Sequence, residues 1–265
     1  MSSVLFGREC RANYKIWLIF AAVLTMYSAV IVSMFDPKLG ESLNLMAQSM
    51  PELFAAFGMA SPGVTMLDFL VNYLYGFLYL VFPLVLVLLL VNRLLARYLE
   101  RGAMAWLLAA PHPRRRIAAT QGAVLALALT SLVAYVTGLC MALSAAMFPG
   151  ELDMAAFLRV NAGLLGMLLL FGGICFAGAC VWGGGKGALA AGGGVSIAFW
   201  LLQMLASVGE KFGFLKYLTP LTLFDPHALA VGGADAWWPV LALYLAAAAL
   251  FGAGVAVFSR RDLCL

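Results

Sequence analysis

The chain alternates long apolar runs with shorter polar segments, and the apolar runs show no alternation of period two. Each run is close to the roughly 20 residues that an α-helix needs to cross a bilayer. A barrel strand would be shorter and would alternate between lipid-facing and interior residues, so the pattern favours helices. We place six spans at residues 16–34, 70–91, 117–141, 160–182, 188–208 and 238–258. The predicted fold is an all-α integral membrane protein with a single transmembrane domain over residues 1–265.

The polar segments between the spans carry patterns of their own. Residues 1–15 mix apolar and basic positions, which is typical of an amphipathic helix lying on the membrane surface. Residues 35–69 hold apolar positions at helical spacing, and we expect one or two external interfacial helices there. Residues 209–237 form a second external segment, in which residues 212–217 predict a short helix. Residues 92–116 form a long basic loop on the other side of the membrane.

Proline and glycine mark irregular or closely packed places in the spans. Pro83 is expected to kink the second span, because proline has no backbone N–H to donate. The sequence GGGKGALAAGGG predicts a tight hairpin between spans four and five, where glycine lets helix backbones approach closely. Helix packing is the favoured role of Gly172, Gly173, Gly178 and Gly183, and sliding or bending of the helices is the alternative.

Composition supports lipid as the solvent of this chain. Of its 265 residues, 65% are hydrophobic and only 11% are charged, and the mean hydropathy is +1.01. A soluble domain is nearer half apolar and about a quarter charged. A soluble globular protein is therefore excluded.

The net charge of +4 is unevenly distributed over the predicted topology. If both termini lie in the cytoplasm, 12 of the 16 lysines and arginines lie there too, and the four outside are Lys38, Arg159, Lys211 and Lys216. Most acidic residues lie on the opposite side. An asymmetry of this kind orients membrane proteins. The basic excess is therefore a topology signal, and we expect no nucleic-acid partner.

Motifs for catalysis and for metal or nucleotide binding are missing from the sequence. It contains no HExxH and no GxSxG, and His112 and His227 fall on opposite sides of the membrane, where they cannot share a metal. The stretch WGGGKGA resembles a phosphate loop only superficially, because Cys180 replaces the first glycine and Gly187 replaces the Ser/Thr. The five cysteines are scattered and predict no disulfide framework. We expect no catalytic residue, no metal and no cofactor on this chain.

Polar side chains inside the predicted spans are few, and none is charged at mid-bilayer. Proton- or sodium-coupled carriers keep ionisable groups in their spans, so secondary transport is disfavoured. Hydrogen bonds between helices, rather than substrate binding, are the favoured role of the polar residues Asn72, Gln121, Thr137, Ser144, Asn161 and Gln203.

The basic loop is the best candidate for a functional element. Residues 93–116 hold six arginines, a glycine that ends the extension of span two, and a short segment with an apolar face that ends at two prolines. An amphipathic helix held between two spans can bind a groove on a cytoplasmic partner. The alternative is a loop that lies passively on the membrane, and the residues alone favour neither.

The sequence of residues 100–111, ERGAMAWLLAAP, followed by the arginines at 114–116, resembles the cytoplasmic loop of ABC-2 type ABC transporter permeases. The family pattern runs Glu-Glu-x-Gly-Thr, then Leu-Leu, Pro and Arg. It is matched by Glu100, Gly102, Leu107, Leu108, Pro111 and Arg114. Leu99 and Ala103 depart from it. The N-terminal arm, the stretch TPLTLFDPHALA at 219–230 and the terminal FSRRD at 258–262 also resemble the family.

The resemblance implies a membrane subunit of an exporter in the plasma membrane of a bacterium, with both termini cytoplasmic. Such a subunit pairs with a second permease, identical or related, above two ATP-binding cassette subunits that hold ATP and magnesium. The loop would contain a coupling helix that contacts the ATPase through Glu100, Arg101, Gly102, Met104, Trp106, Leu107, Leu108, Pro111 and Arg114. External segments near 40–66 and 210–235 would gate the outer end. The cargo would be a hydrophobic or amphipathic compound, drug or peptide.

Two other classes of function stay open. An ATP-independent membrane scaffold or immunity-type binding protein would work without a partner ATPase. A polytopic membrane enzyme would need polar residues converging at one face, and the sequence holds too few to favour it.

Overall fold

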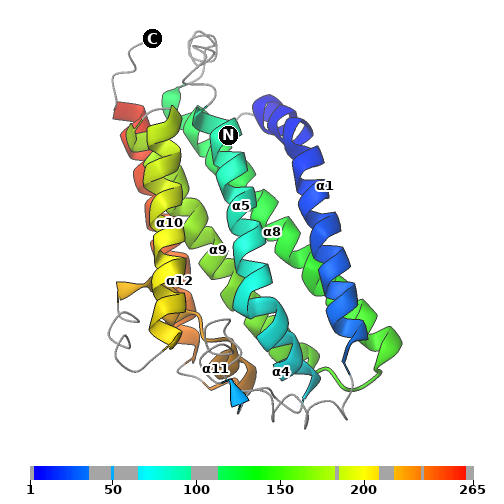
Figure 1. Cartoon of the computed structure of the whole chain (residues 1–265). Helices are drawn as coiled ribbons and strands as arrows, with labels where there is room; N and C mark the ends of the chain where they lie inside the picture. Colours follow the sequence, from blue (N-terminus) through cyan, green and yellow to red (C-terminus); the bar gives the residue numbers. More distant parts are fainter. Residues whose placement is uncertain are drawn as a thin grey trace.

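A computed structural model describes residues 3–35, 49–50, 65–96, 113–182, 185–208, 218–233 and 236–260. All regular structure in these ranges is helical, and the long helices lie side by side (Figure 1). The predicted all-α class is confirmed.

Within the described ranges, five helices are long and apolar enough to cross a membrane. They are α1 (Ser3–Ser33), a composite helix over Met66–Leu95, α8 (Arg114–Met147), α9 (Met154–Trp182) and α12 (Trp237–Arg260). These lengths and compositions support a multi-pass membrane protein. The remaining predicted span, 188–208, lies in α10 (Gly185–Val208), whose apolar stretch, Gly192–Ala206, is shorter than the other five.

The composite helix changes its hydrogen-bond pattern along its length. A short α4 (Met66–Leu70) leads into a π-helical segment η1 (Val71–Leu78), then α5 (Tyr79–Val91) and a second π-helical segment η2 (Asn92–Ala96). Pro83 lies inside α5, between the two wide segments. Short π-helical insertions are rare and occur frequently at functional sites. The departures from α-helical hydrogen bonding therefore lie before and after α5, and the kink expected at Pro83 stays a prediction.

Helix α9 is the centre of the bundle. It contacts α5, α8, α10 and α12, and at one end the short helix α11 (Pro226–Val231). Glycines allow α9 and its neighbours to approach closely. A methyl group on Gly192 of α10 would lie 2.6 Å from Cys175 Cα of α9, and one on Gly173 would lie 3.3 Å from the Ala247 carbonyl of α12. The predicted hairpin of α9 and α10 is present, and its helices touch through their backbones.

Helix α1 includes the described part of the expected N-terminal arm. Residues 3–15 belong to the same continuous helix as the first apolar run, although Figure 1 shows its first turns bent relative to the rest. The Asn13 side chain donates to the Glu9 carbonyl at 2.9 Å within this segment. Apolar residues continue through the polar arm at helical spacing, so the backbone has no reason to break where the charges stop.

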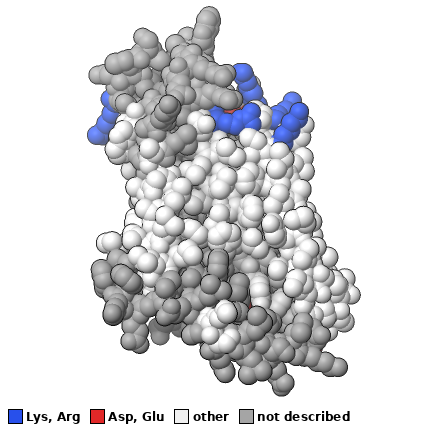
Figure 2. Space-filling view, viewed as in Figure 1, with Lys and Arg blue, Asp and Glu red and all other residues white. Residues whose placement is uncertain are grey.

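Charges of the described residues separate to the two ends of the bundle. The end that holds both termini, here called the basic end, carries one buried acidic residue, Glu9, and eight basic residues: Arg8, Arg11, Lys15, Arg93, Arg114, Arg115, Arg116 and Arg260. Figure 2 shows arginine and lysine side chains gathered there, above an uncharged surface. The opposite end, here called the acidic end, carries Asp68, Glu151, Asp153 and Asp225, together with Arg159.

Candidate functional site at the acidic end

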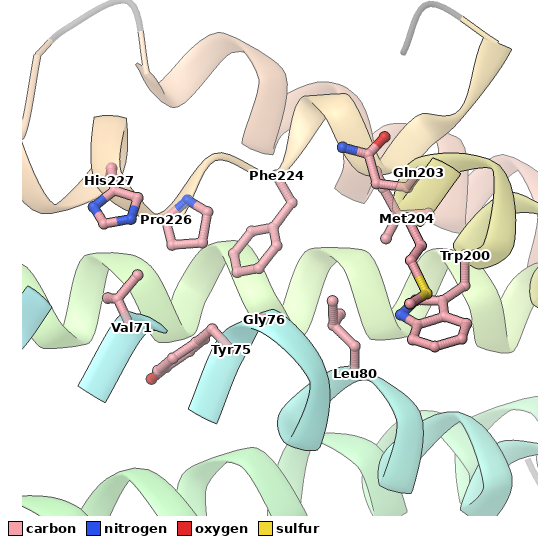
Figure 3. A pocket seen from close by; sticks show the side chains of 11 residues that line it. Val71, Tyr75, Gly76, Leu80, Trp200, Gln203, Met204, Phe224, Pro226 and His227 are labelled. Atoms are coloured by element: carbon pink, nitrogen blue, oxygen red, sulfur yellow. The ribbon is translucent and has the colours of Figure 1, made fainter. Parts of the chain in front are cut away.

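A cavity of about 140 Å³ lies toward the acidic end, between η1, the last turns of α10 and the segment that precedes α12 (Figure 3). Eleven residues line it: Val71, Tyr75, Gly76, Leu80, Trp200, Gln203, Met204, Leu221, Phe224, Pro226 and His227. Three separate parts of the chain therefore build its wall, including one of the rare π-helical segments.

The segment of residues 219–232 owes its shape to local sequence. Pro220 opens a 3₁₀ helix, η4 (Pro220–Leu223). The Asp225 carboxylate then caps α11 by accepting hydrogen bonds from the N–H groups of His227 and Ala228, both at 3.0 Å. Pro226 fits the first helical position, because a backbone N–H there would have no partner within the helix. Gly232 ends the helix at φ +82°. This pattern fixes Phe224, Pro226 and His227 along one side of the cavity.

Arg159 of α9 holds α11 in place. Its Nε donates to the Leu229 carbonyl at 3.1 Å, and its Nη2 donates to the Ala230 carbonyl at 2.9 Å. A cation at the C-terminal end of a helix also interacts favourably with the helix dipole. Gly163, one turn further along α9, leaves room for this docking, because a methyl group there would lie 2.5 Å from the Leu229 side chain.

A polar contact joins α4 to α11 beside the cavity. Thr65 caps α4 and donates to the Asp68 carboxylate at 2.6 Å, while its own oxygen accepts from the Asp68 N–H at 3.2 Å. The Asp68 carboxylate also lies 3.8 Å from His227 Nδ1. His227 Nε2 is buried and has no hydrogen-bond partner. A cavity occupant with an N–H or O–H group could supply one.

Aromatic rings form much of the cavity wall. The Tyr75 ring centroid lies 5.1 Å from that of Tyr79 and 6.5 Å from that of Phe224, and Trp200 lies 5.5 Å from Phe77 in an edge-on arrangement. Figure 3 shows Phe224 pointing toward η1. Rings at such distances attract one another by about 0.5–1.5 kcal/mol beyond the burial of their area. The wall is thus rigid and largely apolar.

A buried polar cluster lies behind the wall. The Tyr79 hydroxyl is 2.6 Å from Ser28 Oγ of α1 and 3.2 Å from Cys140 Sγ of α8, so one side chain links three helices. The neighbouring Tyr75 hydroxyl is buried without a hydrogen-bond partner, as is Asn161 Oδ1 of α9. Buried polar atoms of this kind are uncommon and often mark strain or a function.

The arrangement suits binding of a small apolar group. An apolar cavity of about 150 Å³ accepts a benzene-sized ring. Polar groups are few, and Gln203 Oε1 already accepts a hydrogen bond from Thr219 at 2.8 Å. Within the described ranges, no three His, Cys, Asp or Glu side chains come close enough to hold a metal ion.

The polar residues of the predicted spans have mixed roles. Ser144 donates to Met66 of another helix at 3.1 Å, and Gln203 bonds outside its helix, as expected. Thr137 and Asn161 donate to carbonyls four residues earlier in their own helices. The prediction is wrong for the Thr137 bond, whereas the Asn161 side chain also lies beside the Tyr75 hydroxyl of η1. Both side-chain polar atoms of Gln121 are buried without a partner.

Most of the predicted coupling residues lie outside the described residues: Glu100, Arg101, Gly102, Met104, Trp106, Leu107, Leu108 and Pro111. Arg114 is the first residue of α8, at the basic end. Of the packing glycines, Gly172 faces Leu129 of α8, Gly173 faces α12 and Gly178 is buried in α9. Gly183 also lies outside the described residues.

The cavity itself was not predicted from the sequence. The sequence pattern excludes a metal shared by His227 and His112, and it marks the stretch at 219–230 only as similar to ABC-2 type permeases. The Asp225-Pro226 pair is nevertheless a readable helix-start signal. Nothing in the linear pattern shows that this helix closes a cavity against η1.

Comparison with known proteins returned no match: no family model, no curated protein and no solved structure is similar to this chain.

Proposed function

We propose that the chain is the membrane permease subunit of an ABC-2 type ABC exporter, with α10 as its sixth span. It would pair with a second permease, and separate ATP-binding cassette subunits would bind the loop at residues 97–112. The cargo would be a hydrophobic or amphipathic compound, drug or peptide. The protein would lie in a bacterial plasma membrane with its basic end in the cytoplasm.

The contacts of α9 are the observation that supports this proposal best. Helices α5 and α8, whose ends flank the loop at the basic end, both pack against α9, and α9 also holds α11 through Arg159. A displacement of the loop could therefore reach the cavity at the acidic end through packed helices. Transport subunits need such a connection, because ATP is hydrolysed on one side and cargo leaves on the other.

The charge separation and the cavity wall support the same proposal. The described basic side chains gather where an ATPase would dock, and their asymmetry is the one that orients membrane proteins (Figure 2). The cavity wall combines aromatic rings with the polar groups of Gln203 and His227, and this mixture suits a group of an amphipathic cargo.

Purification from the native membrane tests the proposal. The tagged chain should bring with it a subunit that carries a phosphate loop and hydrolyses ATP. Glu100→Arg and Gly102→Pro should abolish transport and its coupling to ATP hydrolysis, while Gly102→Ala, which keeps the backbone N–H that proline lacks, should retain both. Normal transport by the proline variant would contradict the coupling role. A chain that purifies alone and works without ATP would favour the ATP-independent scaffold.

A further inference from the structure

A second cavity, of about 170 Å³, opens at the surface between α1, α5 and α8, toward the basic end. It is lined by Cys10, Asn13, Tyr14, Trp17, Leu90, Val124, Leu127, Ala128 and Ser131. Tyr14 is 51% exposed and Leu127 is 48% exposed, so the cavity faces outward. We refer to it as the α1–α8 groove.

The deep part of the groove offers only an apolar surface. Trp17 Nε1 donates to the Ala128 carbonyl at 3.1 Å, and Ser131 Oγ donates to the same carbonyl at 3.1 Å. These hydrogen bonds satisfy the polar atoms there. What fills this part must therefore be apolar, because a polar group would lose its hydrogen bonds to water without gaining others.

The groove becomes polar toward the basic end. Asn13 lies about one turn nearer that end than Trp17, and its Oδ1 is buried with no hydrogen-bond partner. Arg93 lies in the π-helical segment η2, which follows Leu90 of the groove wall toward the basic end, and it is half-buried. Arg11 and Lys15 flank the wall on α1, and both are exposed.

The groove is apolar in its deep part and polar toward the basic end, and this change along its length matches an amphipathic molecule. We propose that the α1–α8 groove binds an anionic phospholipid, with one acyl chain against Trp17 and Leu127 and the phosphate among Arg11, Lys15 and Arg93. An anionic headgroup fits a surface of cationic side chains, and each of them attracts an anionic lipid by about 1 kcal/mol near the surface. The proposal holds whether or not the chain is a transporter subunit.

Quenching of Trp17 by brominated lipid tests the groove. The purified chain, with any subunit that accompanies it, is reconstituted in vesicles of phosphatidylcholine that contain dibrominated phosphatidylglycerol or dibrominated phosphatidylcholine. The contribution of Trp17 is the difference between the parent and Trp17→Phe. We expect quenching at a lower mole fraction of the anionic lipid. Equal quenching by both lipids would overturn the proposal.

Charge variants separate headgroup recognition from general contact with lipid. Arg11→Gln, Lys15→Gln and Arg93→Gln should each lower the preference for the anionic lipid about fivefold, which corresponds to about 1 kcal/mol. Arg260→Gln, at the same end but on α12, should leave it unchanged. A preference that falls equally in the Arg260 variant would also overturn the proposal.

Native mass spectrometry provides a second readout. After delipidation, the parent should retain phosphatidylglycerol, whereas Leu127→Trp, which fills the groove, should lose it. Leu245 of α12 is 63% exposed, and Leu245→Trp, which adds the same ring outside the groove, should retain phosphatidylglycerol. Retention by the Leu127 variant, or a second copy of the chain in place of lipid, would contradict the assignment.

Discussion

The most apolar stretches of helices α9 and α1 have nearly the same mean hydropathy, yet they occupy opposite environments. In the most apolar stretch of α9, 72% of the residues are buried by protein, whereas in α1 the share is 22%. The difference lies in side-chain size. Helix α9 carries glycines that admit its neighbours closely, such as Gly163, Gly166 and Gly173, while the described apolar part of α1 has none. Hydropathy therefore does not decide which helix becomes the core. Small residues permit close packing but do not suffice, because α12 carries Gly252 and Gly254 and its most apolar stretch is also only 22% buried.

Matched leucine truncations should give the largest contrast between the two helices. Leu168 of α9 is fully buried, and Leu168→Ala should lower the free energy of unfolding by about 2–5 kcal/mol, because it leaves a cavity. Leu18 of α1 is 52% exposed, and Leu18→Ala should cost less than about 0.5 kcal/mol. Reversible unfolding in mixed micelles measures both. Equal losses would mean that another subunit covers α1.

A pair of glycines tests the close approach to α9. Gly192→Ala places a methyl group 2.6 Å from Cys175 Cα and should destabilise the protein by about 1–3 kcal/mol, because backbone must move. Gly194→Ala, two residues along the same helix, meets nothing within 4 Å. It should be neutral or stabilise by about 0.5–1 kcal/mol. Thermal unfolding in detergent measures the stability of both variants. If Gly192→Ala is as stable as the parent, contact between the backbones of α10 and α9 does not explain why residue 192 is glycine.

Arg159 tests whether α9 also organises the acidic end. Arg159→Met removes two charge-assisted hydrogen bonds to α11 and should destabilise the docked helix by about 2 kcal/mol. Hydrogen exchange should then accelerate at residues 226–231. Arg260→Met removes a cation at the other end and serves as the control. Unchanged protection of α11 would show that apolar contacts alone hold it.

Removal of the Tyr79 hydroxyl, which links α1 to the core, should change the free energy of unfolding least. Tyr79→Phe removes the hydroxyl that contacts Ser28 and Cys140, and it should cost about 1 kcal/mol. Tyr14→Phe, on the exposed face of α1, is the comparison and should change stability little. Both are measured by the unfolding midpoint in the same detergent. A larger loss for Tyr14→Phe would place the stabilising contact of α1 in the groove instead.

Helix type was readable from the sequence, because lipid leaves the backbone no alternative to internal hydrogen bonds. The number of spans was not settled, since six are predicted and five described helices are long enough to cross a membrane. Predicted spans such as 160–182 and 238–258 agree with α9 and α12 within a few residues, apart from the start of α9. The wide turns of η1 were not readable, since Val71–Leu78 has an ordinary helical composition. Their hydrogen bonds depend on what packs around them.

The candidate site likewise has a part that the sequence predicts and a part that it does not. Asp225, Pro226 and Gly232 specify a short capped helix from local chemistry alone. That this helix docks on Arg159, 70 residues earlier in the chain, and faces η1 across a cavity depends on contacts between distant segments. No linear spacing encodes such contacts.

The sequence by itself determined that this protein is helical, that it suits a membrane, and that its charges favour one end, because length, hydropathy and charge act locally along the chain. Only the tertiary structure decided that α9 is the core, that α1 runs unbroken from Ser3, and that two cavities lie at opposite ends. Apolar helices in lipid gain little from hydropathy when they meet. Their arrangement is set by the fit of small and large side chains, which exists only once the helices are together.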